Sequence, residues 1–220
     1  MPYRYKINTA LVESSLRGVQ KRFDHINDTL EMRREAMQDT IVANMLAGYA
    51  YVNTLLERAI NPLHPKQLHH FLELNNIVLC GTNSQARTDY RGHIEATKDR
   101  FYRQAQFSIA HIRAWAEKHQ HDTPYKQAAG VYILQISRPQ LFAEGNHRSG
   151  ALLMSCILVS HGKPPFVLTV DNAKAYFDPS SLAKQTHKNM VGKYYKLPKI
   201  KKKFALFLEG AANSRLLEKC

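Results

Sequence analysis

The stretch LFAEGNHRSG, residues 141–150, places an acidic residue, a Gly-Asn pair, a histidine and an arginine within five consecutive positions. The run that follows it, ALLMSCILVSHG (151–162), is mostly apolar and predicts a helix that is buried on most sides. A loop that ends in a helix start leaves backbone N–H groups unpaired and meets the positive end of the helix dipole. The stretch therefore predicts an anion-binding site at the start of a buried helix.

The side chains of this stretch indicate which anion it suits. Gly145 lets the backbone approach a phosphate closely, Asn146 can hold the turn, and Arg148 offers a planar fork of donors. Glu144 would repel a phosphate unless a magnesium ion bridged the two groups. This chemistry favours a nucleotide di- or triphosphate bound with magnesium. The residues alone also allow a plain polar loop between helices, with Asn146 as a cap and Arg148 on the surface.

The segment FAEGNHR resembles the core motif of the Fic/Doc (FIDO) family, His-x-Phe-x-(Asp/Glu)-Gly-Asn-Gly-Arg-x-x-Arg. The positions that match in register are Phe142, Glu144, Gly145, Asn146 and Arg148. The resemblance implies that the motif carboxylate holds magnesium on the nucleotide, while the loop N–H groups and the first arginine hold the phosphates. It further implies transfer of AMP from ATP to a hydroxyl group of a target protein.

A looser likeness extends over roughly residues 12–180. Residues 39–52 and 65–72 are similar to two of the family's helices, and GKPPFVL (162–168) is similar to the segment after its central helix. TDYRG (88–92) falls where the family has a hairpin that positions the target. The resemblance therefore implies an all-α helical bundle with a buried central helix and a small β-hairpin flap.

The departures from the motif concern catalysis. Gln140 stands at the position of the catalytic histidine, and an amide cannot accept a proton at neutral pH. His147 replaces the second glycine of the motif, and Ala151 replaces its second arginine. If the chain is active, a replacement base is needed, and His93 and His147 are the candidates.

A further departure lies near the start of the chain. ESSLRG (13–18) resembles the inhibitory helix of Fic proteins, yet Arg17 occupies the place of the inhibitory glutamate. An arginine there would attract phosphates, so we count Arg17 among the expected nucleotide-binding residues. Ser14 or Ser15 as an ordinary helix cap is the alternative reading. Asn172, Lys174 and Tyr176 stand where Fic proteins often contact the base.

The sequence therefore leaves the catalytic status open between two classes. The first is a nucleotide-binding protein that has lost or diverged from AMP transfer and acts as a binding or regulatory module. The second is an active transferase that moves AMP or another phosphate-linked group with a replacement base. Gly145, Asn146, His147 and Arg148 are the expected nucleotide contacts in either case, and Glu144 is the expected magnesium ligand.

Apolar periodicity outlines the other elements. It predicts helices over residues 24–58, with a break near Asn27 or Asp39, over 66–79, over 99–119 and over 124–136. The turn-rich segment 81–96 is expected to form a loop or a short hairpin. We expect a Fic-like domain over residues 1–180, including the N-terminal helices, and a basic helical extension over 181–220.

Charge and composition bound the partners. The 220-residue chain carries 31 Lys and Arg against 18 Asp and Glu, a net charge of +13, which favours polyanionic partners. Lys199 and Lys201–Lys203 predict a patch for a polyanion or an acidic membrane, unless they are only a solvated face. The three cysteines, Cys80, Cys156 and Cys220, lack metal or disulfide spacing and are expected to be reduced. We expect a cytoplasmic protein, with a secreted bacterial effector as the alternative.

Overall fold

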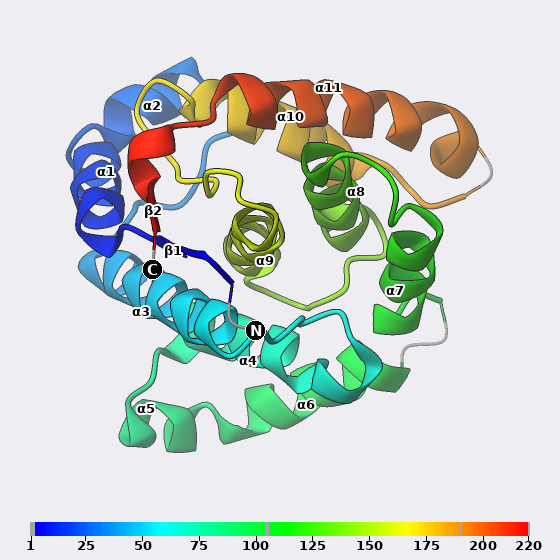
Figure 1. The fold of residues 1–220 in the computed structure, drawn as a ribbon, viewed down its shortest axis with the longest axis horizontal. Helices are drawn as coiled ribbons and strands as arrows, with labels where there is room; N and C mark the ends of the chain where they lie inside the picture. Colours follow the sequence, from blue (N-terminus) through cyan, green and yellow to red (C-terminus); the bar gives the residue numbers. More distant parts are fainter. Residues whose placement is uncertain (1–2, 104–105, 190, 220) are drawn as a thin grey trace.

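The computed structural model describes residues 3–103, 106–189 and 191–219. This part of the chain forms eleven α-helices and two short strands (Figure 1). The helices are α1 (Thr9–Lys21), α2 (Phe23–Thr29), α3 (Asp39–Glu57), α4 (His69–Cys80), α5 (Ser84–Asp89), α6 (Arg91–Arg103), α7 (Ile109–Lys118), α8 (Pro124–Ile136), α9 (Asn146–Ser160), α10 (Ala173–Gln185) and α11 (Leu197–Gly210). The strands are β1 (Tyr5–Ile7) and β2 (Leu217–Lys219). The predicted all-α class is confirmed.

The apolar run after the motif forms α9, which lies in the middle of the helical bundle (Figure 1). Leu152, Met154 and Leu158 on this helix are at most 1% exposed. Helices α3, α4 and α8 pack directly against α9. The predicted buried central helix is therefore confirmed, and its packing fixes the position of the loop that precedes it, residues 140–145. We call this segment the motif loop.

Helices α8 and α9 pack closely because a glycine lies between them. A Cβ atom at Gly150 of α9 would lie 2.6 Å from a ring carbon of Tyr132 on α8, closer than two such atoms can pack. The Tyr132 ring stacks in turn on Phe204 of α11, with ring centroids 5.0 Å apart. Helix α11 is thus packed into the same core, and the boundary expected at residue 180 falls inside α10.

The predicted helix over residues 24–58 is interrupted between Thr29 and Asp39. The sequence predicted a break near Asn27 or Asp39, but the whole segment 30–38 is not helical. Asn27 holds the intervening segment in place. Its side-chain oxygen accepts a hydrogen bond from the Arg34 backbone N–H at 2.8 Å, and its Nδ2 donates to the Arg34 carbonyl at 2.9 Å. This pair of bonds fixes residues 30–38 as an ordered segment that carries Arg34.

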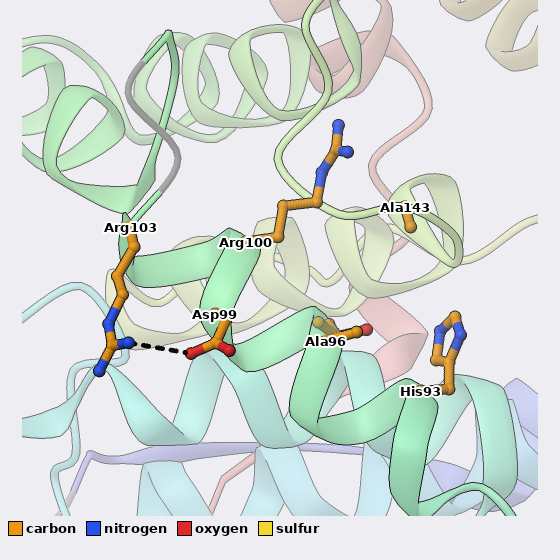
Figure 2. A pocket seen from close by; sticks show the side chains of 7 residues that line it. His93, Ala96, Asp99, Arg100, Arg103 and Ala143 are labelled. Atoms are coloured by element: carbon orange, nitrogen blue, oxygen red, sulfur yellow. Dashed lines mark ion pairs between the residues drawn. The ribbon is translucent and has the colours of Figure 1, made fainter.

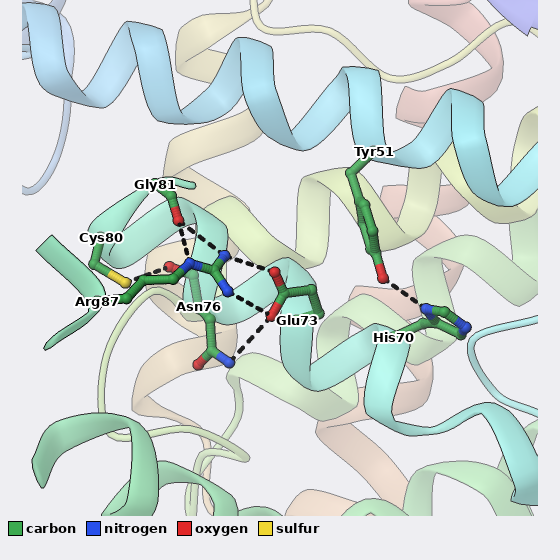
Figure 3. Close-up of polar contacts among 7 residues, drawn as sticks. All are labelled: Tyr51, His70, Glu73, Asn76, Cys80, Gly81 and Arg87. Atoms are coloured by element: carbon green, nitrogen blue, oxygen red, sulfur yellow. Dashed lines mark hydrogen bonds and ion pairs between the residues drawn. The ribbon is translucent and has the colours of Figure 1, made fainter. Parts of the chain in front are cut away.

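The hairpin expected over residues 81–96 was wrong, because this segment forms α5 and most of α6. Gly81 ends α4, and the Asn83 side chain caps α5, so the turn-forming residues separate two helices. Arg87 on α5 reinforces this arrangement, since its guanidinium donates to both carboxylate oxygens of Glu73 and to the Gly81 carbonyl (Figure 3).

The strand pair that is present joins the two ends of the described chain. β1 and β2 are antiparallel, with Tyr5 opposite Lys219 and Ile7 opposite Leu217. Asn53 of α3 fixes the inner end of this pair, because its side chain accepts from the Ile7 N–H at 2.7 Å and donates to the Ile7 carbonyl. The sheet therefore fastens both chain ends to α3 and takes no part in the motif loop.

Two of the cysteines, Cys80 and Cys156, are free and buried, whereas Cys220 lies outside the described residues. Burial raises the pKa of the Cys156 thiol to about 12, so that this thiol is protonated at neutral pH. No helix among the described residues is both long and apolar enough to cross a lipid bilayer.

Candidate functional site

The motif loop closes on itself through Asn146, the first residue of α9. The Phe142 N–H donates to the Asn146 side-chain oxygen at 3.0 Å, and Asn146 Nδ2 donates to the Phe142 carbonyl at 2.8 Å. Asn146 is only 4% exposed, so these bonds form in a protected environment. The predicted role of Asn146 in holding the turn is confirmed.

Gly145 precedes α9 in a left-handed conformation, with φ of 70°. A Cβ atom there would lie 2.8 Å from Asn75 Nδ2, which donates to the Glu144 carbonyl at 3.0 Å. Both the backbone conformation and the neighbouring amide therefore require glycine. The result is an open turn into the start of α9, where the first N–H groups have no partner within the helix.

A cavity of about 600 Å³ lies against this turn. We call it the motif cavity. It is lined by the predicted residues Gln140, Glu144, Gly145, Asn146, His147 and Arg148, and by Ala151 and Tyr176. The structure therefore brings these predicted residues together at one cavity. The predicted residues Arg17, His93, Asn172 and Lys174 are not part of its lining.

The rest of the lining divides into an apolar part and a charged part. The apolar and aromatic side chains come from several segments, and they include Met45, Tyr49, Phe166, Leu168, Tyr176 and Phe177. The charged side chains are Arg33, Arg34, Arg148 and Lys184 with Glu35 and Glu144, which gives the lining a net charge of +2. An aromatic part beside a cationic part suits a ligand with an aromatic base and a negatively charged group.

Arg34 is held rigidly at this cavity, although sequence reasoning did not single it out. One of its terminal nitrogens donates to Ser181 Oγ at 2.6 Å and to the Phe177 carbonyl at 3.3 Å. The guanidinium also lies 5.1 Å above the centre of the Phe177 ring. Its Nε is buried and has no hydrogen-bond partner among the described residues. Arg34 therefore presents a fixed positive charge and an unused donor.

Arg148 both makes a structural hydrogen bond and lines the motif cavity. One terminal nitrogen donates to the Val78 carbonyl in α4 at 2.6 Å, while the side chain also lines the motif cavity. Burial lowers the pKa of its guanidinium, and the nearby carboxylates of Glu35 and Glu144 oppose that shift. Arg148 thus ties the start of α9 to the end of α4.

Gln140 follows the C-terminal end of α8, and its side chain already makes a hydrogen bond to that helix. Its Nε2 donates to the Ile136 carbonyl at 3.0 Å, and the backbone carbonyl of Gln140 accepts a hydrogen bond from Arg100 at 2.9 Å. An amide in this position can orient a neighbouring group but cannot take its proton.

His147 is neutral and poorly suited to act as a base. Its Nδ1 lies 2.9 Å from the Tyr132 hydroxyl, while its Nε2 is buried and has no hydrogen-bond partner over residues 3–103, 106–189 and 191–219. Burial, together with repulsion from Arg34 and Lys184, lowers the pKa of the imidazole to about 3. A base whose conjugate acid is that strong removes protons inefficiently at neutral pH.

This burial predicts acid sensitivity. The pKa of His147 lies near 6.5 in the unfolded chain. The contribution of its neutral form to the free energy of unfolding is therefore fully present above pH 6.5, and it decreases as the pH drops toward 3. We expect the free energy of unfolding to decrease by about 1 to 2 kcal/mol between pH 7 and pH 5 through this group. Urea denaturation at both pH values measures it. His147→Gln, which cannot titrate, should lose less stability over this interval, and an equal loss contradicts the assignment.

Among the predicted residues that lie outside the motif cavity are Arg17 and His93. Arg17 on α1 does not line the motif cavity, because its guanidinium pairs with Asp39 at 2.5 Å. The structure therefore gives no support for the expected contact between Arg17 and a nucleotide. His93 lies on α6 and lines a separate cavity, which shares Ala143 with the motif cavity.

Among the residues described, no group of three or more His, Cys, Asp or Glu side chains is gathered as a metal cluster. The motif cavity nevertheless contains the carboxylates of Glu144 and Glu35. Magnesium is commonly held by one or two carboxylates together with substrate phosphates and water. The residues present therefore fit a magnesium ion that arrives with a nucleotide, as predicted for Glu144.

Comparison with solved structures identifies the fold. The chain is similar to a Fic domain-containing signaling protein from Bacteroides thetaiotaomicron VPI-5482, with a TM-score of 0.50 and 15% sequence identity. The alignment covers 92% of this chain and 91% of that chain. No known protein family matches the chain by sequence, and no curated protein matches it either. At this identity the likeness concerns architecture alone, and it shows that the chain has the Fic fold.

Proposed function

We propose that the motif cavity binds ATP or a related nucleotide together with magnesium. The observation that carries this proposal is the glycine turn into α9, which opens directly onto a cavity that also contains fixed arginines. Gly145 has the left-handed conformation that lets a phosphate approach the backbone, and Arg34 and Arg148 lie on the same cavity. The aromatic side chains of Tyr176 and Phe177 would pack against the base.

Each group would have a separate task in this complex. The N–H groups at the start of α9 and the two arginines would bind phosphate oxygens. Glu144 would hold magnesium, which would neutralise part of the phosphate charge when bound. Ala151 leaves room where the resemblance places a second arginine, and Arg34 would supply positive charge from a different segment.

We further propose that this complex does not perform conventional AMP transfer to protein hydroxyls. Gln140 has no basic nitrogen, and its amide is bonded to the Ile136 carbonyl. The alternative, an active transferase with a replacement base, would need a histidine beside Gln140. His147 is neutral with a strongly lowered pKa, and His93 lies in the neighbouring cavity. The chain would therefore act as a nucleotide-dependent binding or regulatory module.

Calorimetric titration with ATP tests the proposal. We expect saturable binding of one nucleotide per chain in the presence of magnesium, and weaker binding when EDTA removes the metal. ADP and GTP in parallel titrations show which base and how many phosphates the cavity prefers. If none of the three nucleotides binds with or without magnesium, the proposed function is wrong.

A separate proposal concerns three exposed lysines, Lys199, Lys202 and Lys203, on the outer side of α11. They follow closely in the sequence after Tyr194 and Tyr195, which are 64% and 68% exposed. Lysines beside exposed aromatic rings favour an acidic surface as partner, because the charges attract it and the rings pack on it.

Lys201 was wrongly included in this patch. Its ammonium lies 4.4 Å from the centre of the Trp115 ring, and burial lowers its pKa to about 8. Its spacing along the helix turns it toward the core side of α11, where it covers the indole.

A charge-matched comparison tests the lysine patch. We expect replacement of Lys199, Lys202 and Lys203 by Gln to weaken binding to vesicles with acidic lipids and to flatten its salt dependence. The control replaces three exposed lysines on other elements, namely Lys21, Lys66 and Lys118, and keeps the same net charge. Vesicle co-sedimentation over a salt series measures both. If the two triple variants bind vesicles with the same affinity and the same salt dependence, only the net charge matters. That result would contradict a specific binding patch at Lys199, Lys202 and Lys203.

A further inference from the structure

A second cavity, of about 460 Å³, lies between α6 and the motif loop (Figure 2). We call it the α6 cavity. Its polar lining comes from one helix, since His93, Thr97, Arg100 and Arg103 follow one another at intervals of three or four residues. Residues at this spacing share one face of a helix. Ala143 of the motif loop closes the opposite side.

Three polar atoms of this lining are buried and make no hydrogen bond with any residue that the structure describes. They are His93 Nε2, Thr97 Oγ1 and Arg100 Nε. Thr97 is 1% exposed, so its hydroxyl is well inside the protein. Buried polar groups in native proteins are nearly always hydrogen-bonded, and an unpaired one costs free energy. Three of them on one helix face therefore indicate a place for a ligand that supplies the partners.

The charges of the cavity favour an anion. Asp99 pairs with Arg103 at 3.6 Å, and both side chains are mostly exposed. Among the residues that the structure describes, no carboxylate forms an ion pair with Arg100. One of its terminal nitrogens donates to the Gln140 carbonyl at 2.9 Å, which holds the guanidinium against the motif loop. Arg100 therefore provides an uncompensated positive charge in a fixed orientation.

We propose that the α6 cavity binds an oxyanion, the carboxylate or phosphate group of a small molecule, through His93, Thr97 and Arg100. All three free atoms can donate a hydrogen bond: the Arg100 Nε–H always does, the Thr97 hydroxyl rotates, and His93 can carry its proton on Nε2. Donors around one positive charge match the acceptor-only oxygens of a carboxylate or phosphate. Ala143 is the one lining residue that this site shares with the motif cavity, so the proposal does not depend on nucleotide binding.

Nuclear magnetic resonance on the ¹⁵N-labelled chain tests this site. Sodium phosphate and sodium acetate are titrated separately at constant ionic strength, and the readouts are the Thr97 amide and the Arg100 Nε–H resonances. We expect saturable shifts with at least one anion, and the comparison tells whether phosphate or carboxylate is the preferred group. Arg148→Ala, which alters the motif cavity, should leave these shifts unchanged.

Thr97→Val is the decisive variant, because it keeps the shape of the side chain and removes a hydroxyl that has no partner in the described part of the chain. We expect thermal stability to be unchanged or higher and anion affinity to fall about 5- to 10-fold. Arg100→Lys should weaken binding at least as much, whereas the control Arg103→Gln should change it less than twofold. The proposal is overturned if neither anion gives saturable shifts, or if Thr97→Val binds as the wild type does.

Discussion

Wild-type protein is expected to transfer no measurable AMP from ATP to protein hydroxyls, and Gln140→His alone to restore only part of that activity. Loss of a general base costs roughly 10² to 10⁴ in rate. A histidine at position 140 would line the motif cavity, as Gln140 does. His147 and Ala151 would still differ from the motif, and residues that act as one catalytic unit do not contribute additively.

The assay follows label from α-labelled ATP into lysate proteins and into the chain itself. It compares the wild type, Gln140→His, and a triple variant with Gln140→His, His147→Gly and Ala151→Arg. We expect activity to rise in that order, and Arg148→Ala added to the triple variant should remove it again. Robust AMP transfer by the wild type would contradict the account of Gln140 and would require another base.

Arg34→Ala and Arg148→Ala are each expected to lower the affinity for ATP with magnesium by about 10- to 100-fold. A hydrogen bond to a charged group contributes roughly 1.5 to 3 kcal/mol, and each arginine is assigned at least one phosphate contact. Arg148→Ala should also lower thermal stability, because its bond to the Val78 carbonyl is lost. Arg34→Lys, which keeps the charge without the planar fork, should lie between the wild type and Arg34→Ala.

Arg17→Ala serves as the matched control in the same titration. The sequence predicted a phosphate contact for this residue, but its guanidinium pairs with Asp39 and lies outside the lining of the motif cavity. We therefore expect its affinity to stay within twofold of the wild type. A large loss of ATP affinity in Arg17→Ala, together with no loss in Arg34→Ala, would support the phosphate contact predicted for Arg17 from the sequence. It would contradict the phosphate contact that we assign to Arg34.

The parts of the site that the sequence could predict are those set by local rules. Gly145 and Asn146 are typical of a turn, and the apolar run after them predicts a buried helix. The motif loop and α9 could therefore be predicted from residues 141–162 alone. A break near Asn27 or Asp39 was also predicted, although the length of the non-helical segment 30–38 was not. Each of these features depends on neighbours within a few positions.

The features that the sequence missed depend on distant segments. Arg34 reaches the cavity because Asn27 fixes its backbone and because Phe177 and Ser181, about 145 positions away, hold its guanidinium. An Arg-Arg-Glu run at a helix break carries no local signal of that placement. The error over 81–96 has a similar origin, since the residues that usually mark a turn, Gly81 and Asn83, cap two helices here.

A crystal structure of the chain grown with magnesium and a non-hydrolysable ATP analogue tests the nucleotide site most directly. We predict that the phosphates lie against the turn from Gly145 to Arg148, with Arg34 within hydrogen-bonding distance of a phosphate oxygen and Glu144 facing the metal. The base is expected beside Tyr176 and Phe177. A structure at saturating analogue with the motif cavity empty, or with the nucleotide bound elsewhere on the chain, would contradict the account.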